Sequence, residues 1–210
     1  NPRVPGAPVI VITHGAGGTP EAHCERYAEF VRPRAFLLCT RGVENNRHLP
    51  REERGYFYDG HHELGKELRA AIAALAAAEG PNVDTARALF FGYSQGASMG
   101  ALALQEGENA RGFVAALFVE GGTVDWNIAL SKKLAEKGLR RVAMVCGQAS
   151  CKRGADRTIP YLEKGGLGVR LWYAPGGGHT YRGEVGPLVE QAVSWLVEGE
   201  PRFADLVAPR

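Results

Sequence analysis

Residues 89–97 combine an apolar segment with a Gly-x-Ser-x-Gly pattern that has Ser94 at its centre. A segment of small residues follows directly, which is typical of a strand that turns sharply into a helix. A turn this tight requires small residues on both sides of the serine, and Gly92 and Gly96 meet that requirement. The turn would expose the Ser94 hydroxyl at the N-terminus of the helix, where the backbone N–H of Gln95 can bind a developing oxyanion. The pattern therefore predicts that Ser94 is a nucleophile.

A serine hydroxyl is almost wholly protonated near neutral pH, so it needs a base within hydrogen-bonding reach. His179 follows a predicted strand, residues 169–174, across a proline and three glycines. In an open parallel sheet, reactive groups gather at the carboxyl ends of the strands. We therefore expect His179 to be the base.

The base must in turn be oriented by a carboxylate. Asp156 follows the predicted strand 141–146 and precedes His179 in the chain, so it is the first choice. Asp125, after the preceding strand, competes with it, and Glu120 is a more distant third. We expect Asp156 to be the acid of a Ser94–His179–Asp156 triad.

A second glycine-rich loop, residues 14–20, follows the predicted strand 8–13. Such a loop brings backbone N–H groups to the same edge of the sheet. We expect the N–H of Ala16 to be a second oxyanion donor beside that of Gln95. His14 is expected to be structural. The remaining histidines are expected at the surface or at the rim of the site, and they are His23, His48, His61 and His62.

Segments with strand and helix patterns alternate along the whole chain. Predicted strands cover residues 8–13, 35–40, 88–93, 112–119, 141–146 and 169–174, and predicted helices cover 21–31, 60–79, 97–104, 126–137, 156–164 and 185–197. The strands are continuous apolar runs, as in sheets buried on both faces. The pattern predicts a single α/β domain over 1–210, with a doubly wound, mostly parallel sheet of about six strands, helices on both faces and no separate cap domain. We expect 1–7 and 201–210 to be loosely attached ends.

The composition is that of an ordinary globular protein. Of the 210 residues, 45% are hydrophobic and 23% are charged. A net charge of +2 gives no reason to expect binding to nucleic acid or to an anionic membrane surface. No apolar run approaches the ~20 residues that a membrane-spanning helix needs. The predicted chemistry requires neither a metal nor an organic cofactor.

The four cysteines fall into two local pairs. Cys24 lies in a predicted helix and Cys39 at the end of the strand that would pack on it, while Cys151 follows Cys146 closely at the end of another strand. Disulfides 24–39 and 146–151 are therefore feasible, and the second would stiffen the segment that leads to Asp156. A zinc site is disfavoured because no C-x-x-C spacing occurs. The pairs favour an oxidising compartment, hence a periplasmic or secreted protein, over free thiols in the cytoplasm.

Residues 43–59 lack periodicity and contain Tyr56, Phe57 and Tyr58. We interpret them as a long loop that forms a wall beside the serine, with the aromatic rings favouring an apolar or aromatic substrate group. Alternatively, the rings are core residues that anchor the loop. The arginines of this region could bind an acidic substrate group or be solvated surface charges; they are Arg41, Arg47, Arg51 and Arg54.

Together these segments resemble the α/β-hydrolase superfamily over nearly the whole chain. The matching motifs are His14-Gly15, Tyr58-Asp59, the Gly-Tyr-Ser-Gln-Gly of 92–96, the Asp-Arg-Thr-Ile-Pro of 156–160, and Gly178-His179. They are most similar to the small carboxylesterase/phospholipase and acyl-thioesterase type. Cutinases share the serine motif but lack the early His-Gly loop.

The resemblance implies a serine hydrolase that cleaves small-molecule carboxylic esters through an acyl-enzyme. An amidase or peptidase and a thioesterase are alternatives on the same fold. A non-catalytic relative that uses the cleft only to bind a ligand is the alternative of another class.

Overall fold

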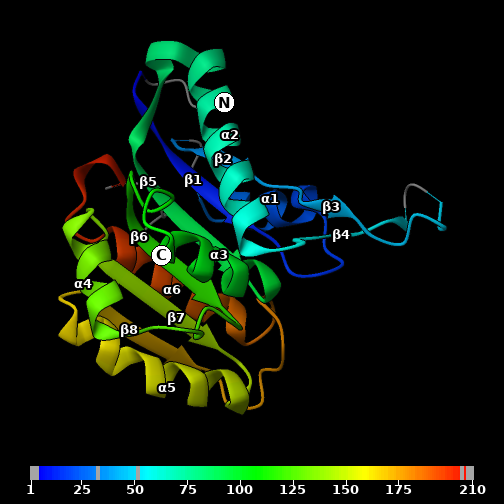
Figure 1. The fold of residues 1–210 in the computed structure, drawn as a ribbon. Helices are drawn as coiled ribbons and strands as arrows, with labels where there is room; N and C mark the ends of the chain where they lie inside the picture. The colour runs from blue at the N-terminus through cyan, green and yellow to red at the C-terminus, as the bar shows by residue number, and fades with distance from the viewer. Residues whose placement is uncertain (1–4, 32–33, 51–52, 204–205, 207–210) are drawn as a thin grey trace.

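A computed structural model describes residues 5–31, 34–50, 53–203 and 206 (Figure 1). Its central sheet has six strands, all parallel, in the order β2-β1-β5-β6-β7-β8. The strands are β1 (Ala7–Thr13), β2 (Phe36–Cys39), β5 (Val83–Tyr93), β6 (Phe113–Val119), β7 (Arg141–Cys146) and β8 (Gly168–Tyr173). The predicted doubly wound sheet is confirmed. Its strand order reverses direction between β1 and β5, and ligands of such sheets bind outside the carboxyl ends of the strands at that point.

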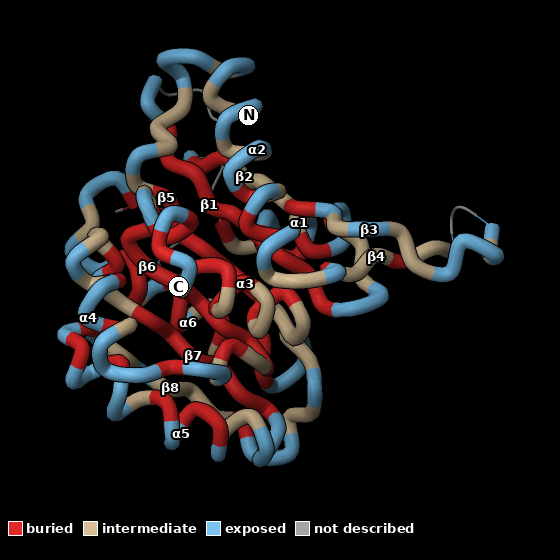
Figure 2. Tube along the Cα trace, viewed as in Figure 1, coloured by how far each residue is buried: buried red, intermediate tan, exposed pale blue. Residues whose placement is uncertain are grey.

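Helices cover both faces of the sheet. They are α1 (Pro20–Ala28), α2 (His61–Glu79), α3 (Gln95–Gln105), α4 (Ile128–Glu136), α5 (Ala149–Lys164) and α6 (Val185–Val197), with short 3₁₀ turns η2 (Gly80–Asn82) and η3 (Pro201–Phe203). Residues of α1 and α6 share one hydrophobic cluster with Ile10 and Ile12, and residues of α2, α3, α4 and α5 share the other with Val9 and Val11. Because alternate side chains of a strand point to opposite faces, the apolar run of β1 serves both layers. Figure 2 shows the buried residues concentrated along these central strands.

Helix α5 begins earlier than predicted, at Ala149 rather than at residue 156. Pro160 suggested a helix start, but it lies inside α5 on the exposed side. Because proline has no N–H, the carbonyl one turn earlier has no amide donor, and on the exposed side water can bind it instead. Asp156 is therefore in mid-helix, not on a loop at the edge of the sheet.

The segment 43–59, predicted to be a loop, contains a short antiparallel pair, β3 (Val43–Glu44) and β4 (Tyr56–Phe57). It extends away from the body of the molecule in Figure 1. Gly18 and Tyr56 form a β-bridge, which joins the base of this arm to the glycine-rich loop after β1.

Parts of both predicted loose ends are packed against the domain. Ala7 belongs to β1, and Phe203 is buried within η3. Of the predicted loose ends, residues 1–4, 204–205 and 207–210 lie outside the described residues. Among the helices that the structure describes, each is too short or too polar to cross a bilayer.

Both predicted cysteine pairs are bonded. The Cα–Cα distances are 6.0 Å for Cys24–Cys39 and 5.5 Å for Cys146–Cys151, within the usual range for disulfides. The first ties α1 to β2, and the second ties the end of β7 to the first turn of α5.

Candidate functional site

Ser94 occupies the turn between β5 and α3, at the point where the strand order reverses. Its backbone has φ 53° and ψ −115°, a conformation that side-chain-bearing residues adopt only under strain. A Cβ on Gly96 would lie 2.5 Å from the carbonyl oxygen of His14, and one on Gly92 would lie 2.7 Å from the Cα of Ala97. The structure thus confirms that only glycine fits on either side of this turn.

His179 lies against the serine, with its Nε2 2.7 Å from the Ser94 Oγ. It comes from the loop after β8, which packs closely on the loop after β7: a Cβ on Gly147 would lie 2.3 Å from the carbonyl oxygen of Gly178. The predicted nucleophile and base, 85 residues apart in the chain, are therefore within hydrogen-bonding distance.

Tyr93, the residue before the serine, holds the backbone of His179. Its hydroxyl donates a hydrogen bond of 2.8 Å to the carbonyl of His179, and the two rings are 5.5 Å apart. Burial, with smaller effects from Tyr181 and Glu120, raises the pKa of Tyr93 to about 12, so the hydroxyl keeps its proton near neutral pH. This contact was not predicted from the sequence.

The carboxylate nearest to His179 is that of Glu120, which follows β6 directly. Its side chain is fully buried, and Oε2 lies 3.3 Å from the His179 Nδ1. Oε1 accepts hydrogen bonds from the backbone N–H groups of Gly147 and, at 3.2 Å, Gln148. The side-chain Oε1 of Gln148 also lies 3.2 Å from Nδ1. The Glu120 contact has an ion-pair distance without good hydrogen-bond geometry, so the carboxylate and the amide compete for the Nδ1 proton.

Asp156 does not reach His179, and this prediction is corrected. Its carboxylate pairs with the Lys152 Nζ at 2.7 Å on α5, and its side chain is 47% exposed. Seven residues of helix separate it from the start of α5, about 10 Å along the axis. Asp125 is exposed in the turn before α4. The signal that would have favoured Glu120 is its position immediately after a fully buried strand and before two glycines.

The glycine-rich loop after β1 lies against the serine turn. A Cβ on Gly15 would lie 3.2 Å from the Ser94 Cβ, and the His14 carbonyl accepts a hydrogen bond of 3.0 Å from the Gly96 N–H. The N–H groups of Gly17 and Gly18 bond within the protein, to Tyr56 and Gly15. Within the described part of the chain, no hydrogen bond involves the N–H of Ala16. That group is available for a ligand, as its expected role requires.

His14 is structural, as predicted. It is buried, its Nδ1 and Nε2 lie 2.8 and 2.9 Å from the carbonyl oxygens of Gly15 and Arg41, and its ring stacks on Tyr58.

His23 is also buried, so its predicted place at the surface or rim is wrong. It belongs to α1, and its ring lies 4.6 Å from that of Tyr181 and 5.6 Å from that of Tyr93. Neither ring nitrogen has a hydrogen-bond partner among the described residues. Burial, and then the neighbouring His14, lower the pKa of His23 to about 4.

Tyr58 anchors the 43–59 arm. It is 3% exposed, and its hydroxyl accepts from the His14 N–H at 3.1 Å and lies 2.8 Å from the Thr40 Oγ1. The side-chain amide of Gln95 both accepts from the Tyr58 N–H and donates to its carbonyl, at 2.9 and 3.2 Å. The anchoring interpretation therefore holds for Tyr58, while Tyr56 and Phe57 are half-buried.

Two of the arginines of this region pair with carboxylates of the protein itself. Arg41 pairs with Glu21, and Arg54 with Glu44. Arg51 lies outside the described residues.

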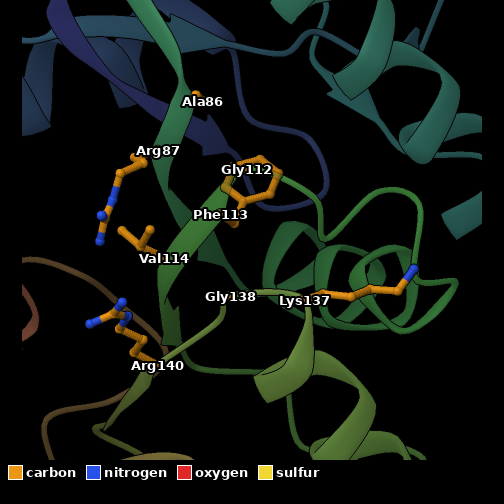
Figure 3. Close-up of a pocket in the computed structure, with 8 residues that line it drawn as sticks. All are labelled: Ala86, Arg87, Gly112, Phe113, Val114, Lys137, Gly138 and Arg140. Atoms are coloured by element: carbon orange, nitrogen blue, oxygen red, sulfur yellow. The ribbon is translucent and has the colours of Figure 1, made fainter.

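Among the described residues, cavities lie at both ends of the sheet. One, of about 340 Å³, is lined by residues after β2 and at the start of α2: Gly42, Val43, Tyr58, Asp59, Glu63, Leu64 and Glu67. The other, of about 200 Å³, lies among the amino-terminal part of β5, the start of β6 and the residues before β7 (Figure 3). Because Ser94 is at the carboxyl edge, the first of these cavities is on the side of the site.

The chain matches no family model and no curated protein. Solved structures resemble it over most of its length. The crystal structure of esterase PE8 has a TM-score of 0.61 and 22% identity, and covers 94% of this chain and 96% of its own. The structure of YahD with malic acid has a TM-score of 0.59 and 16% identity, and the match covers 94% of this chain and 97% of that one. The crystal structure of Zea mays acyl-protein thioesterase 2 has a TM-score of 0.61 and 14% identity, and the match covers 94% of this chain and 96% of that one. These likenesses confirm the α/β-hydrolase fold.

Proposed function

We propose that this chain, with its α/β-hydrolase fold, is a serine hydrolase that cleaves carboxylic esters through an acyl-enzyme on Ser94. The observation that carries the proposal is the distance of 2.7 Å between the Ser94 Oγ and the His179 Nε2, on a strained turn at the edge of the sheet where ligands bind. A serine and an imidazole at this separation can exchange a proton, which makes the hydroxyl a nucleophile.

In the first half of the reaction, the Ser94 Oγ attacks the ester carbonyl carbon while His179 accepts the serine proton on Nε2. The carbonyl oxygen becomes an oxyanion, which accepts hydrogen bonds from the N–H groups of Gln95 and Ala16. The intermediate collapses as His179 returns the proton to the leaving alcohol oxygen. The acyl group remains on Ser94.

In the second half, His179 takes a proton from a water molecule that attacks the acyl-enzyme. The second intermediate releases the carboxylic acid, and the proton returns to the Ser94 Oγ. Each step needs only groups of this chain and water.

We assign the orienting carboxylate to Glu120 in place of Asp156. When His179 takes a proton, its ring becomes cationic, and a buried anion 3.3 Å from Nδ1 stabilises that state. The backbone N–H groups of Gly147 and Gln148 hold the carboxylate in place from the other side.

Esters are the first substrates to test because the similar structures include proteins described as esterases. The acyl-protein thioesterase among them makes thioesters the second class. The two disulfides support an exported protein, since such bonds persist in oxidising compartments.

The test is a panel of nitrophenyl esters of increasing acyl length, with a thioester and an anilide beside it. Ser94→Ala should lower kcat on the order of 10⁶-fold, as loss of the nucleophile of a catalytic triad does. Ser98→Ala, one turn along α3, is the matched control and should retain activity. A fluorophosphonate probe should label Ser94, located by peptide mass spectrometry. Full activity of Ser94→Ala refutes the proposal, and ligand binding without any labelling favours a non-catalytic binding protein.

A further inference from the structure

Three metal-binding side chains converge where α2 begins and α3 ends: His61, His62 and Glu106. The His61 Nε2 lies 3.6 Å from the Glu106 Oε1, and the His62 Nδ1 contacts the same oxygen. The three donor atoms all lie within 4.8 Å of one another. One cation placed among them could therefore contact all three.

Helical spacing alone does not bring these rings together. Successive residues of a helix point about 100° apart, and neighbours in sequence do not normally face each other. Here the two imidazole rings have centroids 4.1 Å apart, and both turn toward one carboxylate oxygen from another helix.

The carboxylate is held in this orientation from behind. The Asn109 Nδ2 donates a hydrogen bond of 2.9 Å to the Glu106 Oε2, which leaves Oε1 for the histidines. Asn109 is itself buried and fixed by a second bond of 2.9 Å to the Ala103 carbonyl and by a contact from Arg69. Metal ligands are commonly oriented by such outer hydrogen bonds.

The electrostatics of α3 also favour a cation at this point. Glu106 is the C-cap residue of α3, and the carboxyl end of a helix carries a partial negative charge. Two neutral imidazoles add ligand atoms without adding positive charge.

We propose that His61, His62 and Glu106 bind a divalent transition-metal ion of the zinc type. Two imidazoles and a carboxylate suit Zn²⁺, Ni²⁺ or Cu²⁺, whereas Mg²⁺ prefers sites made of oxygen ligands. Three protein ligands leave at least one position for water. The side chains are 33%, 72% and 29% exposed, so the ion enters directly from solvent. Bound metal would tie the start of α2 to the end of the helix that begins beside Ser94.

The test is calorimetric titration of untagged, chelator-treated protein with ZnCl₂ at about pH 8. One zinc per chain is expected. Each of His61→Ala, His62→Ala and Glu106→Gln should weaken binding at least tenfold. His48→Ala, which removes an exposed histidine of the 43–59 arm, should leave it unchanged. MgCl₂ should give no heat of binding.

Equal zinc affinity in the wild type and in all three ligand variants would overturn the proposal, as would no binding at all. If the three side chains only hydrogen-bond to one another, no zinc binding is expected. If a variant does not fold by circular dichroism, histidine-ring NMR of the unaltered protein gives the answer: zinc should shift two of the six histidine rings. Zinc that shifts His179 or inhibits hydrolysis without involving His61 would place the ion at Ser94 and likewise refute the site.

Discussion

Replacing Glu120 by Gln removes one buried negative charge beside His179 and keeps the shape of the side chain. The charge matters most when His179 is cationic, because the distance from Oε2 to Nδ1 is then that of an ion pair, 3.3 Å. Two unit charges at this separation attract by about 5 kcal/mol at an effective dielectric of about 20. His179 is 44% exposed, so solvent screens part of that attraction.

The expected loss in kcat is therefore about 10²- to 10³-fold. It should be smaller than the ~10⁴-fold loss of a variant that also holds the wrong imidazole tautomer. The Gln148 Oε1, 3.2 Å from Nδ1, still accepts the Nδ1 proton and preserves the tautomer that Ser94 needs. KM should change little, since Glu120 is buried behind the base.

The assay is steady-state hydrolysis of a nitrophenyl ester by Glu120→Gln, with Asp156→Asn as the matched carboxylate control. Asp156→Asn breaks only an exposed ion pair with Lys152 and should keep kcat within about twofold. Circular dichroism checks that both variants fold. The reasoning fails if Glu120→Gln retains wild-type kcat, or if Asp156→Asn is the variant that loses it.

Three further outcomes follow from named contacts. Tyr93→Phe removes the hydrogen bond to the His179 carbonyl, whose loss costs about 1 kcal/mol. In steady-state hydrolysis, kcat should therefore fall about fivefold at unchanged KM. An unaffected kcat would contradict this role of Tyr93. Because burial lowers the pKa of His23 from 6.5 to about 4, the unfolded state binds the proton first as pH falls. The free energy of unfolding should therefore be highest above about pH 6.5, and it should fall by about 3 kcal/mol as the pH is lowered to 4. Urea unfolding across this range, compared with His23→Phe, checks it, and parallel pH profiles would refute it. A double Cys→Ser variant removes the Cys24–Cys39 bridge, whose cysteines are 15 residues apart. Its free energy of unfolding, measured in urea, should be about 3 kcal/mol lower. No change would mean that the two thiols are unpaired.

The turn at Ser94 and the order of alternating strands and helices could be predicted because their signals are local, and so could the position of His179 on a loop at the same edge of the sheet. Glycines on both sides of Ser94 mark a turn that no larger residue can follow, and the continuous apolar run of β1 reads as a strand buried on both faces. The cysteine pairs were also within reach, since each pair joins segments adjacent in sequence.

Which carboxylate lies beside His179 is decided by tertiary structure. Whether Asp156 or Glu120 meets His179 depends on where α5 begins and how the loops after β6, β7 and β8 pack, and the sequence around Pro160 suggested a different helix start. Tyr58 is a similar case, because its hydroxyl bonds to His14 and Thr40, which directly follow β1 and β2. A local pattern reports the conformation of its own segment, but distances between segments far apart in the chain follow from the packing of the whole core.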